Sequence, residues 1–125
     1  MIDALLDTHS LLWVLAGDER VPPWLGADVV RDPARFAVSD VSFWEIAIKC
    51  STGRLRAPDD LPDVVAELGF GQASITRTQV WGVRGLPMHH RDPFDRLLVS
   101  QAMDLAVPLV TADVDISRYD IAVLW

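Results

Sequence analysis

A chain of 125 residues, 50% of them hydrophobic, can bury a core of its own and is too apolar to be disordered. Its single cysteine, Cys50, excludes a disulfide framework and favours a reducing compartment. The apolar opening lacks the basic start of a signal peptide, and no apolar run reaches the length of a membrane span. We therefore expect one globular, cytoplasmic domain over residues 1–125, with no membrane contact.

Short apolar runs alternate with helical patterns along the chain. Strands are expected at residues 2–6, 36–38, 73–75, 108–110 and 121–124. Helices are expected after Asp7 with Thr8 as a candidate cap, then over residues 41–50, 61–68 and 78–84, and finally from Pro93 behind an Asp92 cap. This alternation predicts an α/β fold of three layers, α/β/α, with a central parallel sheet of four to five strands.

Four acidic residues follow strand-like runs, at once or within a few residues: Asp7, Glu45, Asp95 and Asp113. Because the carboxyl ends of parallel strands meet at one edge of a sheet, we expect these side chains to converge there. Carboxylates at such short range raise each other's pKa and stay ionised only beside a cation. An all-oxygen pocket of this kind suits Mg²⁺ or Mn²⁺. The pattern predicts a metal-dependent phosphodiesterase that acts on RNA.

Two of these acids have an equally simple structural interpretation. Asp7 could cap the helix that follows it. Ser42 and Glu45 match a capping box, and Glu45 with Lys49 forms a favourable i,i+4 pair. Local evidence alone favours the structural interpretation of Glu45.

The other two acids are less easily explained by structure. Asp92 already supplies the cap of its helix and could pair with Arg96, which leaves Asp95 with no duty beyond the helix dipole. Asp113 could form an Asx turn, and Asp115 competes with it as the fourth acid. The joint pattern favours function, since independent capping would not require an acid at the same sheet edge after several strands.

The net charge of −7 is unfavourable for an enzyme that binds nucleic acid. A bound metal would offset part of this charge, and every cation except Lys49 is arginine, the better bidentate phosphate ligand. Candidate RNA-binding residues are the cations and histidines nearest the acids: Lys49, Arg91, Arg96, His9 and His90. Ion pairs on helix faces are the alternative for the three cations.

Five blocks spread over nearly the whole chain carry a family resemblance: LLDTHSLLW (5–13), FWEIAIK (43–49), HRDPFDRLLVSQA (90–102), LVTAD (109–113) and YDIAVLW (119–125). In these blocks the chain strongly resembles the PIN-domain toxins of the VapC type. The resemblance implies a PIN fold and an endoribonuclease that depends on Mg²⁺ or Mn²⁺, with transfer RNA or ribosomal RNA as the substrate. It also implies a homodimer that a small cognate antitoxin neutralises.

The catalytic acids of that family carry over to Asp7, Glu45, Asp95 and Asp113, and Glu45 would reach the metal through water or orient the nucleophile. Thr8 and Thr111 would support these acids without binding the metal. The resemblance allows one metal ion or two, about 4 Å apart. Hydrolysis of this kind should leave a 5′-phosphate and a 3′-hydroxyl.

Two other classes of protein fit parts of the pattern. A catalytically inactive PIN-like module would keep the fold and bind only a partner protein, but it would have no reason to retain four mutually repelling acids. A phosphoacceptor receiver domain is similar in length and doubly wound. It resembles this chain poorly, because Thr8 stands where a second acid is expected and no lysine follows Lys49.

Overall fold

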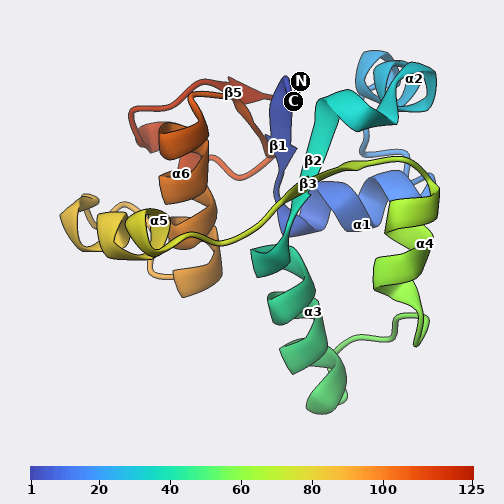
Figure 1. The fold of residues 1–125 in the computed structure, drawn as a ribbon, viewed down its shortest axis with the longest axis horizontal. Coiled ribbons are helices and arrows are strands. Elements are labelled where there is room, and N and C mark those ends of the chain that lie inside the picture. The colour runs from blue at the N-terminus through green and yellow to red at the C-terminus, as the bar shows by residue number, and fades with distance from the viewer.

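The computed structural model describes residues 1–125 and places a parallel five-stranded sheet between layers of helices (Figure 1). The strands are β1 (Ala4–Leu6), β2 (Phe36–Ser39), β3 (Gly71–Ala73), β4 (Leu109–Val110) and β5 (Val123–Leu124). Their order is β3-β2-β1-β4-β5, and every neighbouring pair is parallel. The predicted α/β/α architecture is confirmed.

Six α-helices connect the strands: α1 (Thr8–Ala16), α2 (Pro23–Arg31), α3 (Asp40–Ser51), α4 (Leu61–Glu67), α5 (Arg77–Gly82) and α6 (Pro93–Leu105). Three short 3₁₀ turns accompany them: η1 (Pro33–Arg35), η2 (Val83–Gly85) and η3 (Ile116–Arg118). Helices α1, α2 and α4 lie on one side of the sheet, and α5 and α6 lie on the other (Figure 1). None of the helices combines the length and apolarity that crossing a membrane requires.

The central strand β1 is buried on both of its faces. Leu6 packs into a core with Leu11 of α1 and Leu25 of α2, whereas Leu5 packs into a second core with Leu98 of α6. Neighbouring residues of a strand point to opposite faces, so a strand between two helical layers reads as a continuous apolar run. The chain leaves β1 towards β2 on one side and returns to β4 on the other, so the strand order reverses beside β1, where α/β sheets bind ligands.

Strand β3 (Gly71–Ala73) begins two residues earlier than predicted, so the expected strand at residues 73–75 is misplaced. Pairing with β2 joins Gly71 to Ala37 and Ala73 to Ser39. A Cβ atom on Gly71 would lie 2.9 Å from the carbonyl oxygen of Ala34, so the close approach of η1 needs a glycine here. Tertiary contact, not the apolar pattern of the strand, therefore decides where β3 begins.

Two predicted caps are also wrong. Asp7 caps α1 in place of Thr8, and its carboxylate accepts the N–H of Ser10. Helix α3 starts earlier than expected with Ser39 as its N-cap, so Ser42 lies inside the helix and the predicted capping box does not form. A β-strand that runs directly into a helix places the cap at the strand's last residue. Helix α2, which begins at a proline, was not predicted at all.

Candidate functional site

The four predicted acids come from four different elements and gather at one edge of the sheet. Asp7 follows β1, Glu45 lies on α3, Asp95 belongs to the first turn of α6, and Asp113 follows β4. The charges of Asp7 and Glu45 both act on Asp95. Asp7 and Asp113 line one cavity of about 180 Å³. The structure therefore brings together carboxylates that are more than a hundred positions apart in the sequence.

Asp7 combines a capping contact with a place in this cluster. Its Oδ1 atom accepts the backbone N–H of Ser10 at 2.8 Å, and the Ser10 hydroxyl donates to the carbonyl of Val110 at 2.9 Å. The second oxygen, Oδ2, accepts no hydrogen bond from the protein. The start of α1 thus holds Asp7 in place through one oxygen and leaves the other available.

Glu45 has an unsatisfied buried oxygen. The residue is only 2% exposed, and its Oε2 atom pairs with Lys49 Nζ at 2.7 Å. Its Oε1 atom is buried without any hydrogen-bond partner. An unpaired carboxylate oxygen in a low-dielectric interior is costly, so such an atom needs a ligand to explain it.

Asp95 is the acid whose ionisation the site disturbs most. Burial is the main cause that raises the pKa of Asp95 to about 7. Three further carboxylates add to this rise: Asp92, Asp7 and Glu45. His90 partly offsets them. Ionisation of Asp95 is therefore unfavourable unless a cation offsets its burial and the neighbouring negative charge.

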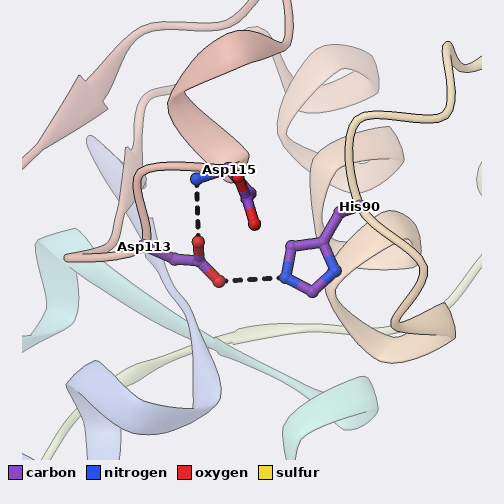
Figure 2. A group of neighbouring side chains, drawn as sticks. All are labelled: His90, Asp113 and Asp115. Carbon is purple, nitrogen blue, oxygen red and sulfur yellow. Dashed lines mark hydrogen bonds and ion pairs between the residues drawn. The ribbon is translucent and has the colours of Figure 1, made fainter.

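Asp113 is held from two sides, as Figure 2 shows. His90 Nε2 lies 2.9 Å from its Oδ2 atom, and the backbone N–H of Asp115 donates to its Oδ1 atom at 2.9 Å. Burial alone would raise the pKa of Asp113, but these hydrogen bonds outweigh burial and lower it. The predicted Asx turn is present, and the hydroxyl of Thr111 accepts the N–H of Asp113 at 3.0 Å.

His90 links two of the acids. Its Nε2 atom lies 3.3 Å from Asp95 Oδ2 as well as 2.9 Å from Asp113 Oδ2. Burial lowers the pKa of His90, but the hydrogen bond to Asp113 and the negative charges of Asp95, Asp113 and Asp92 raise it overall. The Nδ1 atom accepts the N–H of Asp92 at 3.0 Å, which fixes the proton on Nε2 in the neutral form and opposes further protonation.

The remaining predicted residues fall into two groups. Lys49 pairs with Glu45 at the site, Arg91 is exposed, and His9 lines the cavity that Asp7 also lines. Arg96, in contrast, is 8% exposed, and its guanidinium donates only to backbone carbonyls and to Tyr119 Oη. The surface pair expected between Arg96 and Asp92 is therefore absent, because the Nη1 and Nη2 atoms of Arg96 are engaged elsewhere, whereas RNA binding by Arg96 stays a prediction.

The two predicted supporting threonines make different contacts. Thr8 donates its hydroxyl to Ser42 Oγ at 3.0 Å, and so joins α1 to α3. Thr111 orients Asp113 through the hydrogen bond described above. No sequence pattern pointed to Tyr119, whose hydroxyl accepts the N–H of His90 at 3.0 Å. A tyrosine that approaches a loop 29 positions away leaves no local signal in a sequence.

The donors of this site fit a hard divalent cation. All of the candidate ligands among the acids are carboxylates, the ligand type that Mg²⁺ and Mn²⁺ favour. The unpaired Oε1 atom of Glu45 and the pKa of Asp95, raised by burial and by neighbouring carboxylates, are both features that a bound cation would relieve. A further group, His90 with Asp113 and Asp115, offers ligand atoms within 4.8 Å of one another. Asp115 is exposed, and both it and Asp113 remain candidates for the fourth acid.

Comparison with solved structures finds the same fold in three complexes. DNA-bound VapBC from Salmonella typhimurium has a TM-score of 0.72 at 15% identity, with 99% of this chain and 98% of that chain covered. VapBC2 from Rickettsia felis, bound to a fragment of its promoter DNA, has a TM-score of 0.71 at 14% identity, with 99% and 98% covered. A toxin–antitoxin complex from Klebsiella pneumoniae has a TM-score of 0.68 at 14% identity, with 98% and 97% covered.

Sequence comparison gives the family. No curated protein sequence matches the chain. The family model of the PIN domain, in contrast, matches residues 4–122 and thus spans every strand of the sheet except the last, β5. Structural likeness at 15% identity shows the fold alone, but a family match over nearly the whole length shows descent. This chain belongs to the PIN-domain family.

Proposed function

We propose that this chain is the toxin of a type II toxin–antitoxin system of the VapC type, a cytoplasmic endoribonuclease in which residues 1–125 form one catalytic domain. The observation that carries the proposal is the set of converging acids with a buried, unpaired Glu45 oxygen and an Asp95 pKa of about 7. The family supports it, because PIN domains are generally nucleases. The structural neighbours support it too, since three of them are toxin–antitoxin complexes.

Each acid has a distinct proposed role. Asp7, Asp95 and Asp113 would bind Mg²⁺ or Mn²⁺, and Glu45 would bind it directly or through water. When bound, the cation supplies Lewis acidity for in-line attack of water on phosphorus. Asp95 would lose its proton as the cation binds, because a nearby positive charge favours the ionised carboxylate over the burial and repulsion that raise its pKa. Cleavage would leave a 5′-phosphate and a 3′-hydroxyl.

The residues around the acids would orient the site and the RNA. Thr111 holds Asp113 and Thr8 ties α1 to α3, so both would fix the acids without binding the metal. Lys49, Arg91 and His9 are near enough in the sequence or the structure to contact the flanking nucleotides of a transfer RNA or ribosomal RNA. Since the net charge is −7, this contact would depend on the bound cation more than on a basic surface.

We also propose two protein partners, a small cognate antitoxin and a second copy of this chain. An apolar cavity of about 350 Å³ on the side of α1, α2 and α4 supports the antitoxin; it is lined by Val14, Leu15, Val29, Val30, Pro33, Leu68 and Phe70. Three large exposed side chains support the homodimer: Val80, Trp81 and Met88, on α5 and the segment after it. Apolar surface gathered in one place marks protein interfaces.

The test is cleavage of structured RNA by purified protein, with mapping of the 5′ ends. We expect activity in Mg²⁺ or Mn²⁺, loss of activity with a chelator, and at least a hundredfold loss in Asp95→Asn, since metal-binding acids contribute on this scale. The matched control is Asp63→Asn, an exposed acid on α4, which should keep full activity. Antitoxin binding without any cleavage would instead identify a catalytically inactive PIN module.

A further inference from the structure

His90 is held more firmly than a surface loop residue needs to be. The hydroxyl of Tyr119 accepts its backbone N–H at 3.0 Å, and Arg96 Nη1 lies 3.4 Å from its carbonyl oxygen. Tyr119 is 3% exposed, and Arg96 also donates to the hydroxyl of Tyr119 at 3.1 Å. The N–H of Asp92 donates to His90 Nδ1 at 3.0 Å. Backbone and ring are thus fixed separately.

This anchoring directs a single donor at two acids. With Nδ1 engaged by Asp92, the only remaining N–H of the ring is on Nε2, which lies 2.9 Å from Asp113 Oδ2 and 3.3 Å from Asp95 Oδ2. Asp95 and Asp113 come from different elements, the first turn of α6 and the loop after β4. The imidazole Nε2 therefore lies between two carboxylates that would serve the proposed metal site.

The carboxylate oxygens of the site are not equally available. Asp7 Oδ2, Glu45 Oε1 and Asp95 Oδ1 accept no hydrogen bond within the protein. Both oxygens of Asp113 are in use, one with His90 Nε2 and the other with the N–H of Asp115. Three acids thus have an oxygen with no hydrogen-bond partner, whereas each oxygen of Asp113 already accepts one.

We propose that His90 is a built-in substitute for the catalytic cation, which joins Asp95 to Asp113 in the metal-free protein and competes with the divalent ion for them. The inference rests on the proposed metal site. It makes His90 a positioning residue that acts through Asp113, and not an RNA contact or a metal ligand. When the ion replaces His90 at the carboxylates, only the imidazole would have to move, because Tyr119 and Arg96 keep the backbone of His90 in place.

The test measures Mn²⁺ binding by calorimetry in variants that separate the two ring nitrogens. In His90→Asn the side-chain oxygen can still accept the Asp92 N–H, but no donor reaches the carboxylates. In His90→Gln an amide N–H replaces the Nε2 donor. We expect Mn²⁺ to bind His90→Asn roughly tenfold more tightly than wild type, the equivalent of one lost charge-assisted hydrogen bond. His90→Gln should bind within about threefold of wild type.

The control is His89→Asn, because His89 is the half-buried neighbour whose ring contacts Tyr119 and makes no ion pair with a carboxylate. It should bind Mn²⁺ as wild type does. Equal affinity in His90→Asn would overturn the inference, and weaker affinity would overturn it by making His90 a ligand. If wild type binds no Mn²⁺, the proposed metal site itself is refuted. If wild type binds Mn²⁺ and His90→Asn binds it no more tightly, only the inference about His90 is refuted, so the two failures are distinguishable.

A second readout follows the ring itself. In ¹⁵N spectra of the metal-free protein, His90 should show a proton on Nε2 and an acceptor at Nδ1. Saturation with Mg²⁺ should move the Nε2 signal of His90 as its carboxylate partner is lost, while the His89 signals stay in place. An Nε2 signal that Mg²⁺ leaves unmoved would show that His90 keeps its contacts, and so would contradict competition.

Discussion

At the scale of single residues, the site is defined by buried or partly buried carboxylates that lie close together. Asp95 is buried among other carboxylates and has a pKa of about 7, against an ordinary value of 3.8. Glu45 keeps one buried oxygen without a partner. Both features weaken the folded state when the acids are ionised, and both are relieved by a cation. A site built in this way sacrifices stability of the metal-free protein for affinity towards the ion.

The raised pKa of Asp95 predicts how metal-free stability depends on pH. The folded protein binds the Asp95 proton more tightly than the unfolded chain, so this stabilisation is complete below pH 3.8 and is lost as the pH rises through about 7. His90, whose pKa is also raised, acts in the same direction above its ordinary value of 6.5. The lowered pKa of Asp113 contributes a constant amount in this window, because its effect is lost only at lower pH.

In a chelator, the free energy of unfolding should therefore fall between about pH 5 and about pH 8, by an amount on the order of 2–4 kcal/mol. Urea unfolding at each pH measures it. For Asp95→Asn, the free energy of unfolding should depend much less on pH and should exceed that of wild type at the upper end of the range. Adding Mg²⁺ should raise the free energy of unfolding of wild type and leave that of the variant unchanged. A wild-type stability that rises with pH across this window would refute the assignment of Asp95.

At the scale of elements, strand ends and helix starts coincide at the site. Helix α1 begins at the residue after Asp7, and helix α6 begins after Asp92 and carries Asp95 in its first turn. Helix N-termini favour negative charge, so each acid is stabilised by its helix before any cation binds. The same residue can therefore serve as a cap and as a metal ligand, and the two roles are not alternatives for Asp7.

Substitutions at Asp7 should separate these roles. Asparagine is as good an N-cap as aspartate, so Asp7→Asn should retain stability in a chelator and lose cleavage and Mn²⁺ binding. Asp7→Ala should lose the same activities and about 1 kcal/mol of stability as well. Chemical unfolding and RNA cleavage on the same preparations give both numbers. Full activity in Asp7→Asn would exclude a charged role for this residue.

The edge strand β3 depends on a close contact with η1. An added Cβ at position 71 would meet the carbonyl oxygen of Ala34 at 2.9 Å, and neither backbone can retreat without breaking the pairing with β2. We expect Gly71→Ala to lower the free energy of unfolding by about 1–3 kcal/mol. Gly85→Ala is the control, because nothing lies within 4 Å of the Cβ that it adds. Equal stability of the two variants would contradict the close approach.

At the scale of the whole molecule, apolar surface remains uncovered. Trp81 is 66% exposed on α5, and the guanidinium of Arg84 lies over its ring, 4.9 Å from the centroid. Val80 and Met88 are exposed nearby in the sequence. Large apolar side chains gathered in one segment are expensive to hydrate, so they are the natural interface for the proposed second copy.

A charged substitution tests this interface. Trp81→Glu should convert the homodimer into a monomer in sedimentation experiments, with the folded structure retained, because the indole makes few contacts within its own chain. Trp24→Glu is the matched control, since Trp24 is 44% exposed on α2, away from α5. Dimers that persist in Trp81→Glu would place the interface elsewhere.

The amino-acid sequence by itself determined the alternation of strands and helices and the positions of the acids. Apolar runs such as Ala4–Leu6 and Leu109–Val110 are local signals, and burial on both faces makes them continuous in the sequence. The proline after Asp92 fixed the start of α6 equally well. Parallel topology then predicted that acids following these strands would share one edge, which the structure bears out as geometry.

Only the tertiary structure decided which partner each polar group finds. Arg96 and Asp92 look like a surface pair in the sequence, yet folding buries the guanidinium against carbonyls and Tyr119, because the loop before α6 offers unpaired carbonyl oxygens there. The His90 ring contacts Asp113, which is 23 positions away in the sequence. The register of β3 is set by pairing with β2, in which Gly71 lies opposite Ala37. Such contacts depend on the packing of distant elements, and distant packing leaves no periodicity for a sequence pattern to reveal.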